Sequence, residues 1–276
     1  MSLVEYQESY IFNSATNSGA VNKSVDGSTF TVNFNTPLSI PREAVAATVE
    51  LIGARIWYNT ANISTALGNN QFRYIIAGVP KVFPIPDGLY TLAGLNDLIS
   101  RELVIAGFAA NAIVLTGDSA TQKSVFTFNT VASQVDLTLT DTPFELLGFT
   151  NRLVPLAPST IVGQSEVGDT VANFNLVESY LIHSSMVANG VSVNSFGANI
   201  LSDIPIDVAV GSQIVFEPRN PRRTSINELV GAPVGTFRFW LTSQDSDFYI
   251  DTRNENWSAT LLIRYNLPLE NINRTM

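Results

Sequence analysis

The feature that most constrains the fold is a series of short apolar runs between residues 199 and 265. In the run 235–243, Phe237, Phe239 and Leu241 alternate with more polar neighbours, a period of two that is typical of a strand with one buried face. Proline and glycine residues separate the runs, as expected for turns. This part of the chain is therefore predicted to form consecutive antiparallel strands at residues 199–206, 211–218, 235–243, 247–250 and 257–265.

Similar patterns predict further strands nearer the N-terminus. The run 44–58 is rich in β-branched residues and contains Gly53, which predicts a long strand with a bulge at the glycine rather than a helix. Further strands are predicted at residues 29–34, 71–77, 112–115, 124–128, 135–139 and 174–186.

Only residues 92–104 have the period of a helix of several turns. Thr91 is positioned to cap this helix, and its apolar residues recur every three or four positions: Leu92, Leu95, Leu98, Ile99 and Leu103. Residues 142–149 are predicted to form a single helical turn, with Pro143 at its first position and Gly148 at its end.

About twelve strands with frequent turns and one helix predict an all-β fold, a β-sandwich or jelly roll with the helix decorating one connection. We treat residues 1–276 as a single jelly-roll unit with flexible arms at about 1–28 and 266–276, and residues 153–168 as an internal linker.

Charge limits the classes of function. Only 14% of the residues are charged, against roughly 25% in an average soluble domain. This favours either a subunit that buries surface against neighbours or a surface rich in uncharged polar residues. The net charge of −9 argues against binding to nucleic-acid phosphates. The absence of cysteine excludes disulfides and thiolate chemistry, and the first residues lack the pattern of a secretion signal, which predicts an intracellular protein without membrane insertion.

No set of residues predicts catalysis or a bound cofactor. His183 is the only histidine, and because a base needs a nucleophile and an orienting partner, it is interpreted as an ordinary strand residue. Asp245, Asp247 and Asp251 lie close together in the sequence but lack the spacing of a calcium-binding loop. We therefore predict no enzyme activity, no metal and no cofactor.

The one dense basic cluster is formed by Arg219, Arg222 and Arg223. Guanidinium groups suit bidentate contacts with carboxylates or phosphates. In an acidic chain, acidic groups of a protein are the favoured partner, so these arginines form a candidate interface. A solvated loop is the alternative interpretation.

Six phrases, in order along residues 80–265, carry a family resemblance. They are residues 85–90 (Ile-Pro-Asp-Gly-Leu-Tyr) before the helix, 145–149 (Glu-Leu-Leu-Gly-Phe), 199–201 with 204–206, 216–218 (Phe-Glu-Pro), 237–241 with Asp247, and 257–263 (Trp-Ser-Ala-Thr-Leu-Leu-Ile). The set resembles the penton-type minor capsid proteins of virophages and polinton-like viruses, which are single jelly rolls.

This resemblance implies a structural role in a virion. The implied partners are further copies of the chain in a homopentamer at the icosahedral five-fold vertices, and the major capsid protein around it. Assembly inside the host cell is implied as well, and no catalytic residue is carried over. Because some members of the family add an insertion domain, the resemblance implies that residues 80–156 are either an insertion lobe or part of the main body. Two alternatives stay open: another viral structural module, such as a major capsid, spike or tail component, and a carbohydrate-binding jelly roll whose stacking platforms would be Trp57, Tyr58, Trp240 and Trp257.

Overall fold

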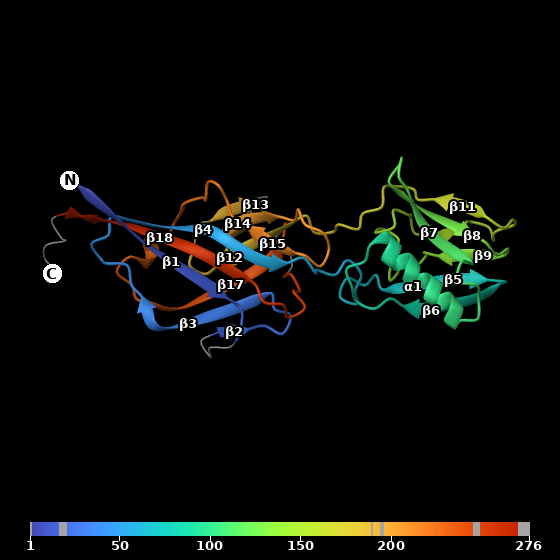
Figure 1. Cartoon of the computed structure of the whole chain (residues 1–276), viewed down its shortest axis with the longest axis horizontal. Helices are drawn as coiled ribbons and strands as arrows, with labels where there is room; N and C mark the ends of the chain where they lie inside the picture. Colours follow the sequence, from blue (N-terminus) through green and yellow to red (C-terminus); the bar gives the residue numbers. More distant parts are fainter. Residues whose placement is uncertain (1, 17–20, 189, 194–195, 245–248, 270–276) are drawn as a thin grey trace. The chain divides into compact units, whose positions relative to one another are not determined.

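The protein consists of two compact units. The computed structural model describes residues 2–16, 21–188, 190–193, 196–244 and 249–269. Unit 1 comprises Met1–Thr60 with Val177–Met276, and unit 2 comprises Ala61–Leu176 (Figure 1). Residues 80–156 lie wholly within unit 2. Among the described residues, no helix combines the length and the apolar character needed to cross a bilayer.

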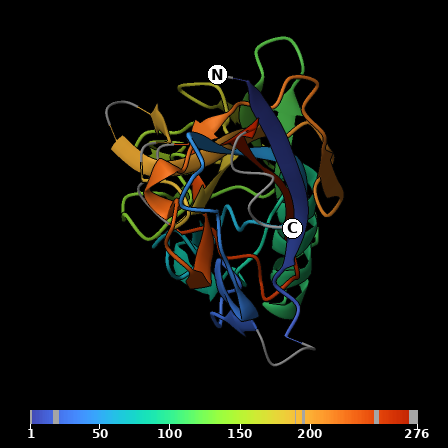
Figure 2. The same ribbon diagram turned by 90° about the vertical axis from the view of Figure 1, so that its left-hand side faces the viewer.

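The first sheet of unit 1 joins segments from the two ends of the chain. Across the sheet, the strands are β1 (Leu3–Asn13), β18 (Ser258–Pro268), β4 (Ala46–Trp57) and β15 (Gln213–Phe216), with the short β16 (Thr224–Ser225) also paired to β4. Every residue of β1 has an antiparallel partner in β18, and Figure 2 shows these two strands side by side. Residues 3–13, expected in a flexible arm, are therefore a strand of the sandwich.

The second sheet completes the jelly roll. Its order is β13 (Val191–Val193), β14 (Phe196–Pro205), β12 (Ser179–Ser184), β17 (Val234–Ser243), β3 (Thr29–Leu38) and β2 (Val21–Lys23). Of the eight principal strands, the first, eighth, third and sixth form one sheet, and the second, seventh, fourth and fifth form the other. This interleaved order is that of a jelly roll, so the predicted fold class is confirmed. The connection between β16 and β17 contains a short 3₁₀ helix, η1 (Asn227–Leu229).

Aromatic side chains fill the space between the two sheets. Phe30 stacks on Phe239, with ring centroids 5.2 Å apart, and meets Trp257 edge-on at 4.7 Å. Phe12 of β1 reaches the same group, 4.7 Å from Phe239. The Trp257 indole N–H donates to the Gly27 carbonyl, so its polar atom is satisfied inside the core. These aromatic side chains therefore pack against one another in the core of the sandwich.

Unit 2 has its own core between two small sheets and the helix. The sheets are β10 (Leu153–Val154), β9 (Ser133–Asp136), β5 (Gln71–Ile76) and β6 (Val79–Pro84), and β11 (Gln164–Val167), β8 (Lys123–Phe128) and β7 (Ile113–Asp118). The helix is α1 (Leu92–Ile105), and the Thr91 side chain caps it by accepting from the Gly94 N–H. Leu95, Leu98, Ile99 and Leu103 are buried, which confirms the predicted helix and its apolar stripe.

Three local predictions had different outcomes. The bulge at Gly53 is confirmed, because the register between β18 and β4 shifts beside it. The helical turn at residues 142–149 is confirmed: the Leu147 N–H donates to the Pro143 carbonyl, and Gly148, at φ 73°, ends the turn as the Phe149 N–H donates to the Phe144 carbonyl. Of the predicted strand 247–250, residues 247 and 248 lie outside the described residues, and Tyr249 forms an isolated bridge with Thr242.

Candidate functional site

The predicted arginines lie beside an open sheet surface, which we call the outer face. It is the side of the sheet of β1, β18, β4 and β15 that points away from the core. Because successive strand residues alternate between faces, Val49 and Leu51 of β4 enter the core, whereas Glu50 points outward. Ile11 and Val215 on this face are 76% and 57% exposed, so the outer face is accessible in the single chain.

A buried carboxylate organises one half of the outer face. Glu50 is only 3% exposed and contacts the guanidinium groups of Arg223, at 2.8 Å, and Arg264, at 3.0 Å. Arg264 also contacts Glu5 of β1 at 2.7 Å. These carboxylates raise the pKa of Arg264, with the hydrogen bond to Glu5 as the largest cause. The network ties the β15–β16 loop to three strands, since an unpaired buried carboxylate would be costly.

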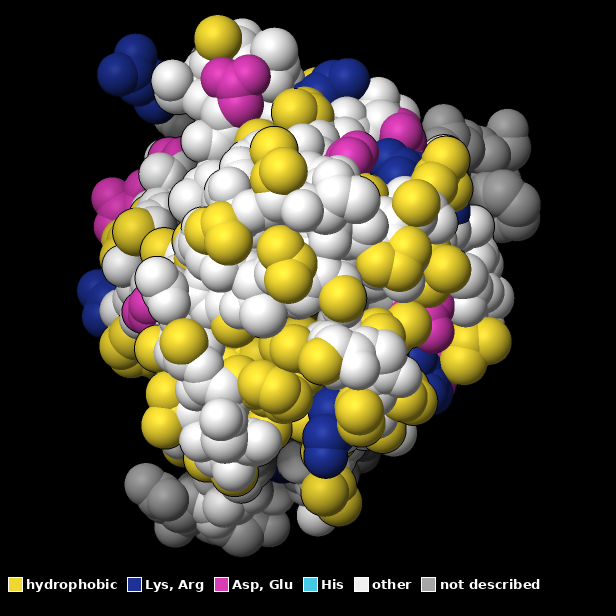
Figure 3. Space-filling view, turned by 90° about the vertical axis from the view of Figure 1, so that its right-hand side faces the viewer, with side chains coloured by type: hydrophobic (Ala, Val, Ile, Leu, Met, Phe, Trp, Pro, Cys, Tyr) yellow, Lys and Arg dark blue, Asp and Glu magenta, His cyan; other side chains and the backbone are white. Residues whose placement is uncertain are grey.

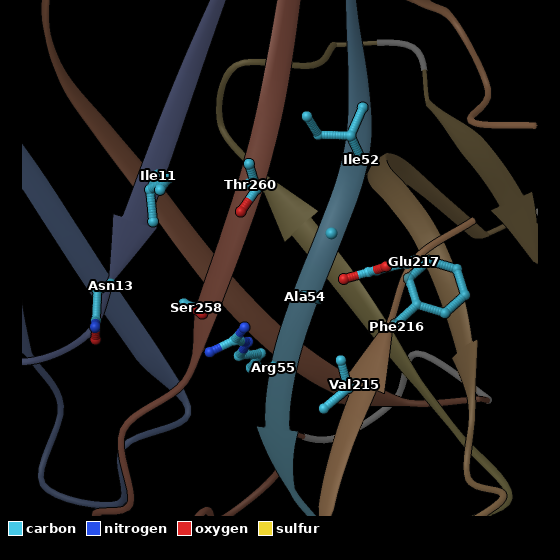
Figure 4. A pocket seen from close by; sticks show the side chains of 11 residues that line it. Ile11, Asn13, Ile52, Ala54, Arg55, Val215, Phe216, Glu217, Ser258 and Thr260 are labelled. Atoms are coloured by element: carbon cyan, nitrogen blue, oxygen red, sulfur yellow. The ribbon is translucent and has the colours of Figure 1, made fainter. Parts of the chain in front are cut away.

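A groove occupies the other half of the outer face. It has a volume of about 400 Å³ and runs across β1, β18, β4 and β15 (Figure 4). Ile11 and Val215 stand at its two sides, and its floor is low where Gly53 has no side chain. Arg55 and Glu217 add charged groups to a lining that otherwise consists of Phe216 and of small, polar or aliphatic residues. Such a mixture suits a polypeptide surface better than a compact apolar ligand.

The outer face is positively charged within an acidic chain. Arg55, Arg219 and Arg222 are exposed, and no ion pair involves them in the part of the chain that the structure describes. With Arg223 and Arg264, the outer face and its adjoining 217–223 loop hold five arginines against three glutamates, Glu5, Glu50 and Glu217. The local net charge is therefore +2 in a chain of net charge −9, which favours contact with an acidic surface.

The structure separates the roles of the three predicted arginines. Arg223 is already committed to Glu50 and Glu5, whereas Arg219 and Arg222 extend from the same loop without such a partner among the described residues. Sequence reasoning missed Arg55, Arg264 and the glutamates that accompany them. One signal was present: Glu50 interrupts a long apolar strand, and a carboxylate in that setting needs a cationic neighbour.

His183 lies in the opposite sheet as part of an aromatic stack. Its ring is parallel to Trp240 at 5.0 Å, and its Nε2 shares a 2.8 Å hydrogen bond with the Thr242 hydroxyl. Burial lowers the pKa of His183 to about 4, so the imidazole is neutral at physiological pH. Arg238 lies over the Trp240 ring at 5.3 Å and over Tyr249 at 5.9 Å. These contacts describe a packed strand residue, as interpreted from the sequence.

The remaining candidate groups do not assemble into a site. Asp245 and Asp247 lie outside the described residues, and Asp251 accepts the backbone N–H of Arg253. Within the described ranges, no three histidine or acidic side chains group as metal ligands. Of the four aromatic residues considered as stacking platforms, Tyr58 and Trp257 are core residues at 4% and 2% exposure.

Comparisons with known proteins find similarity at the level of structure. The sequence matches no protein-family model and no curated protein. The fold is similar to the crystal structure of the selenomethionine-labelled mavirus penton protein, with a TM-score of 0.47 and 10% sequence identity. The match covers 96% of this chain and 100% of that chain.

Proposed function

We propose that this chain is a viral structural protein: a minor capsid subunit of penton type that forms rings of five copies at the vertices of an icosahedral shell. The observation that carries the proposal is the accessible outer face of the jelly roll, with net charge +2 in a chain of net charge −9. In a closed ring, two different surfaces of each subunit must complement each other. A basic face on an acidic subunit satisfies this requirement.

The packing of unit 1 supports a structural role for the sandwich. Phe12, Phe30, Phe239 and Trp257 occupy the space between the sheets. The side chains that can contact a partner therefore lie on the surface of the jelly roll. The ordered phrases that resemble penton-type capsid proteins point to the same role, with the virion as the location and the major capsid protein as the second partner.

In the proposed mechanism, the outer face receives an acidic surface of the next copy. Arg219, Arg222 and Arg55 supply cations that have no ion pair in the described chain, while Glu50 holds Arg223 in place beside them. Ile11 and Val215 supply apolar contact around the groove. The charges set orientation and encounter rate, and burial of the apolar side chains supplies much of the affinity.

The test is the solution mass by light scattering over a range of protein and salt concentrations. We expect a species near five times the 30.0 kDa chain, weakening at high salt because exposed charges are screened. The double variant Arg219→Glu and Arg222→Glu is expected to lower the five-copy fraction at least tenfold. The control, Lys81→Glu with Arg101→Glu, makes the same charge change on exposed residues of unit 2. A stable trimer, or equal effects of the two double variants, would contradict the proposal.

A further inference from the structure

One end of unit 2, which we call the distal end, is made of four segments without charge: residues 77–80, 104–112, 129–132 and 155–164. None of their residues is Asp, Glu, Lys, Arg or His. Backbone hydrogen bonds hold the segments together: Ala77 N–H donates to Ala132, and Ala132 N–H donates to Ser159. Figure 1 likewise places the β5–β6 turn and the loop before β11 at the same end of unit 2.

The distal end presents aliphatic side chains to solvent. The exposed fractions are 49% for Val79, 55% for Val104, 71% for Ile105, 48% for Val131, 75% for Leu156, 63% for Ile161 and 67% for Val162. In Figure 3, most of the coloured side chains on the displayed face of unit 2 are hydrophobic. Exposed aliphatic groups that gather on one surface mark an interaction site more often than a scattered few do.

The polar groups of the distal end are used locally. The Asn129 side chain donates to the Asn111 carbonyl, the Ser159 hydroxyl donates to the Thr130 carbonyl, and the Gln164 side chain accepts from the Thr160 N–H. These bonds satisfy the loops from within. The surface that is left for a partner is mainly apolar and offers few hydrogen-bond donors and acceptors.

We propose that the distal end binds the distal end of a second copy of this chain across a twofold axis. Such an axis places residues against their own copies, so any charged group near it would meet its like. Copies of net charge −9 repel each other, and the distal end is a surface on which they can meet without adding like charges. A charged partner would find no complementary group there, which favours self-association over binding to a basic or acidic protein.

The contact is expected to be weak in a free pair. A stable interface of standard size uses about 20–30 residues on each side, and the distal end offers seven exposed aliphatic side chains as its centre. It is therefore expected to act between chains of different rings at high local concentration, because neighbours within a five-copy ring are related by a five-fold axis and cannot make a twofold contact.

Disulfide trapping tests the proposal, because the chain has no native cysteine. A Thr160→Cys variant places one thiol at the distal end. The matched control, Ser119→Cys, places one in the exposed β7–β8 turn at the other end of those strands. Under the same oxidant and concentration, Thr160→Cys chains are expected to form covalent dimers at least tenfold faster than the control. Equal rates would overturn the proposal.

Substitution of two aliphatic residues by aspartate tests whether apolar contact, and not chance collision, causes the disulfide trapping. In the Thr160→Cys background, Ile161→Asp should reduce the rate to that of the control, whereas Val167→Asp, at an exposed valine near the other end of β11, should leave it unchanged. Unchanged trapping with Ile161→Asp would count against the proposal. So would flotation of the native chain with phosphatidylcholine vesicles that Ile161→Asp abolishes, which would assign the distal end to a lipid surface instead.

Discussion

At the scale of single residues, His183 shows how packing sets a protonation state. The ring lies against Trp240 and shares a hydrogen bond with Thr242, and its exposed fraction is 3%. Burial disfavours the charged imidazolium and lowers the pKa to about 4, below the value near 6.5 of an exposed histidine. The unfolded chain therefore binds a proton on this residue more readily than the folded chain does.

That difference makes the stability of the protein depend on pH. The contribution of His183 to the free energy of unfolding is complete above about pH 7. It decreases as the pH falls from 6.5 toward 4, because protonation then favours the unfolded chain. Between pH 7 and pH 5 we expect the free energy of unfolding to fall by about 2 kcal/mol from this residue alone. Urea titrations of the native chain and of His183→Gln, which cannot titrate there, should diverge by that amount, and parallel pH profiles would refute the expectation.

At the scale of secondary structure elements, Glu50 connects segments that are far apart in the sequence. Through Arg223 and Arg264 it links β4 to the β15–β16 loop and to β18, and Arg264 continues to β1. Glu50→Gln would leave both guanidinium groups with a weaker acceptor at a buried position. We expect a loss of about 2 kcal/mol in the free energy of unfolding, measured by urea denaturation.

The exposed Glu217 provides the matched comparison for Glu50. It also belongs to the outer face, but no ion pair joins it to the described residues, so Glu217→Gln should change stability by less than about 0.5 kcal/mol. Similar effects of the two substitutions would mean that the network does not hold the strands together.

The elements that could be predicted from the sequence are those set by local patterns. Helix α1 follows from the spacing of Leu95, Leu98, Ile99 and Leu103 and from its Thr91 cap. The bulge in β4 follows from Gly53 in a β-branched run. The alternation in β17 gives both its strand character and the burial of Phe237 and Phe239. In each case, neighbours in the chain carry the information.

What could not be predicted depends on pairing between distant segments. Residues 3–13 alternate, with Val4, Tyr6, Tyr10 and Phe12 on one face, but this pattern does not reveal that β18, more than 240 residues later, supplies every partner. The limits of unit 2 depend likewise on β5 pairing with β9. The outer face could be predicted only in part. The arginine cluster is visible in the sequence, but its position beside Glu50 follows only from the order of the strands.

At the scale of the whole molecule, unit 2 is inserted into the connection between β4 and β12. The segment of unit 1 before the insertion and the segment after it are joined by a 2.6 Å hydrogen bond between the Thr60 and Tyr180 hydroxyls. Within unit 2, the segments that enter and leave are joined by Asn62, whose side chain donates to the Phe174 carbonyl. Each unit thus closes on itself, and each has its own buried core.

This arrangement predicts that the jelly roll folds without unit 2. A chain in which about six Gly and Ser residues replace residues 61–176 should unfold cooperatively in urea, because a short flexible loop costs less entropy to close than a long one. Light scattering of this chain should show the same salt-sensitive five-copy species as the full protein, since Arg55, Arg219 and Arg222 all remain. A folded monomer would locate the ring contacts in unit 2 and contradict the role proposed for the outer face. A chain that fails to fold would show instead that the two units depend on each other.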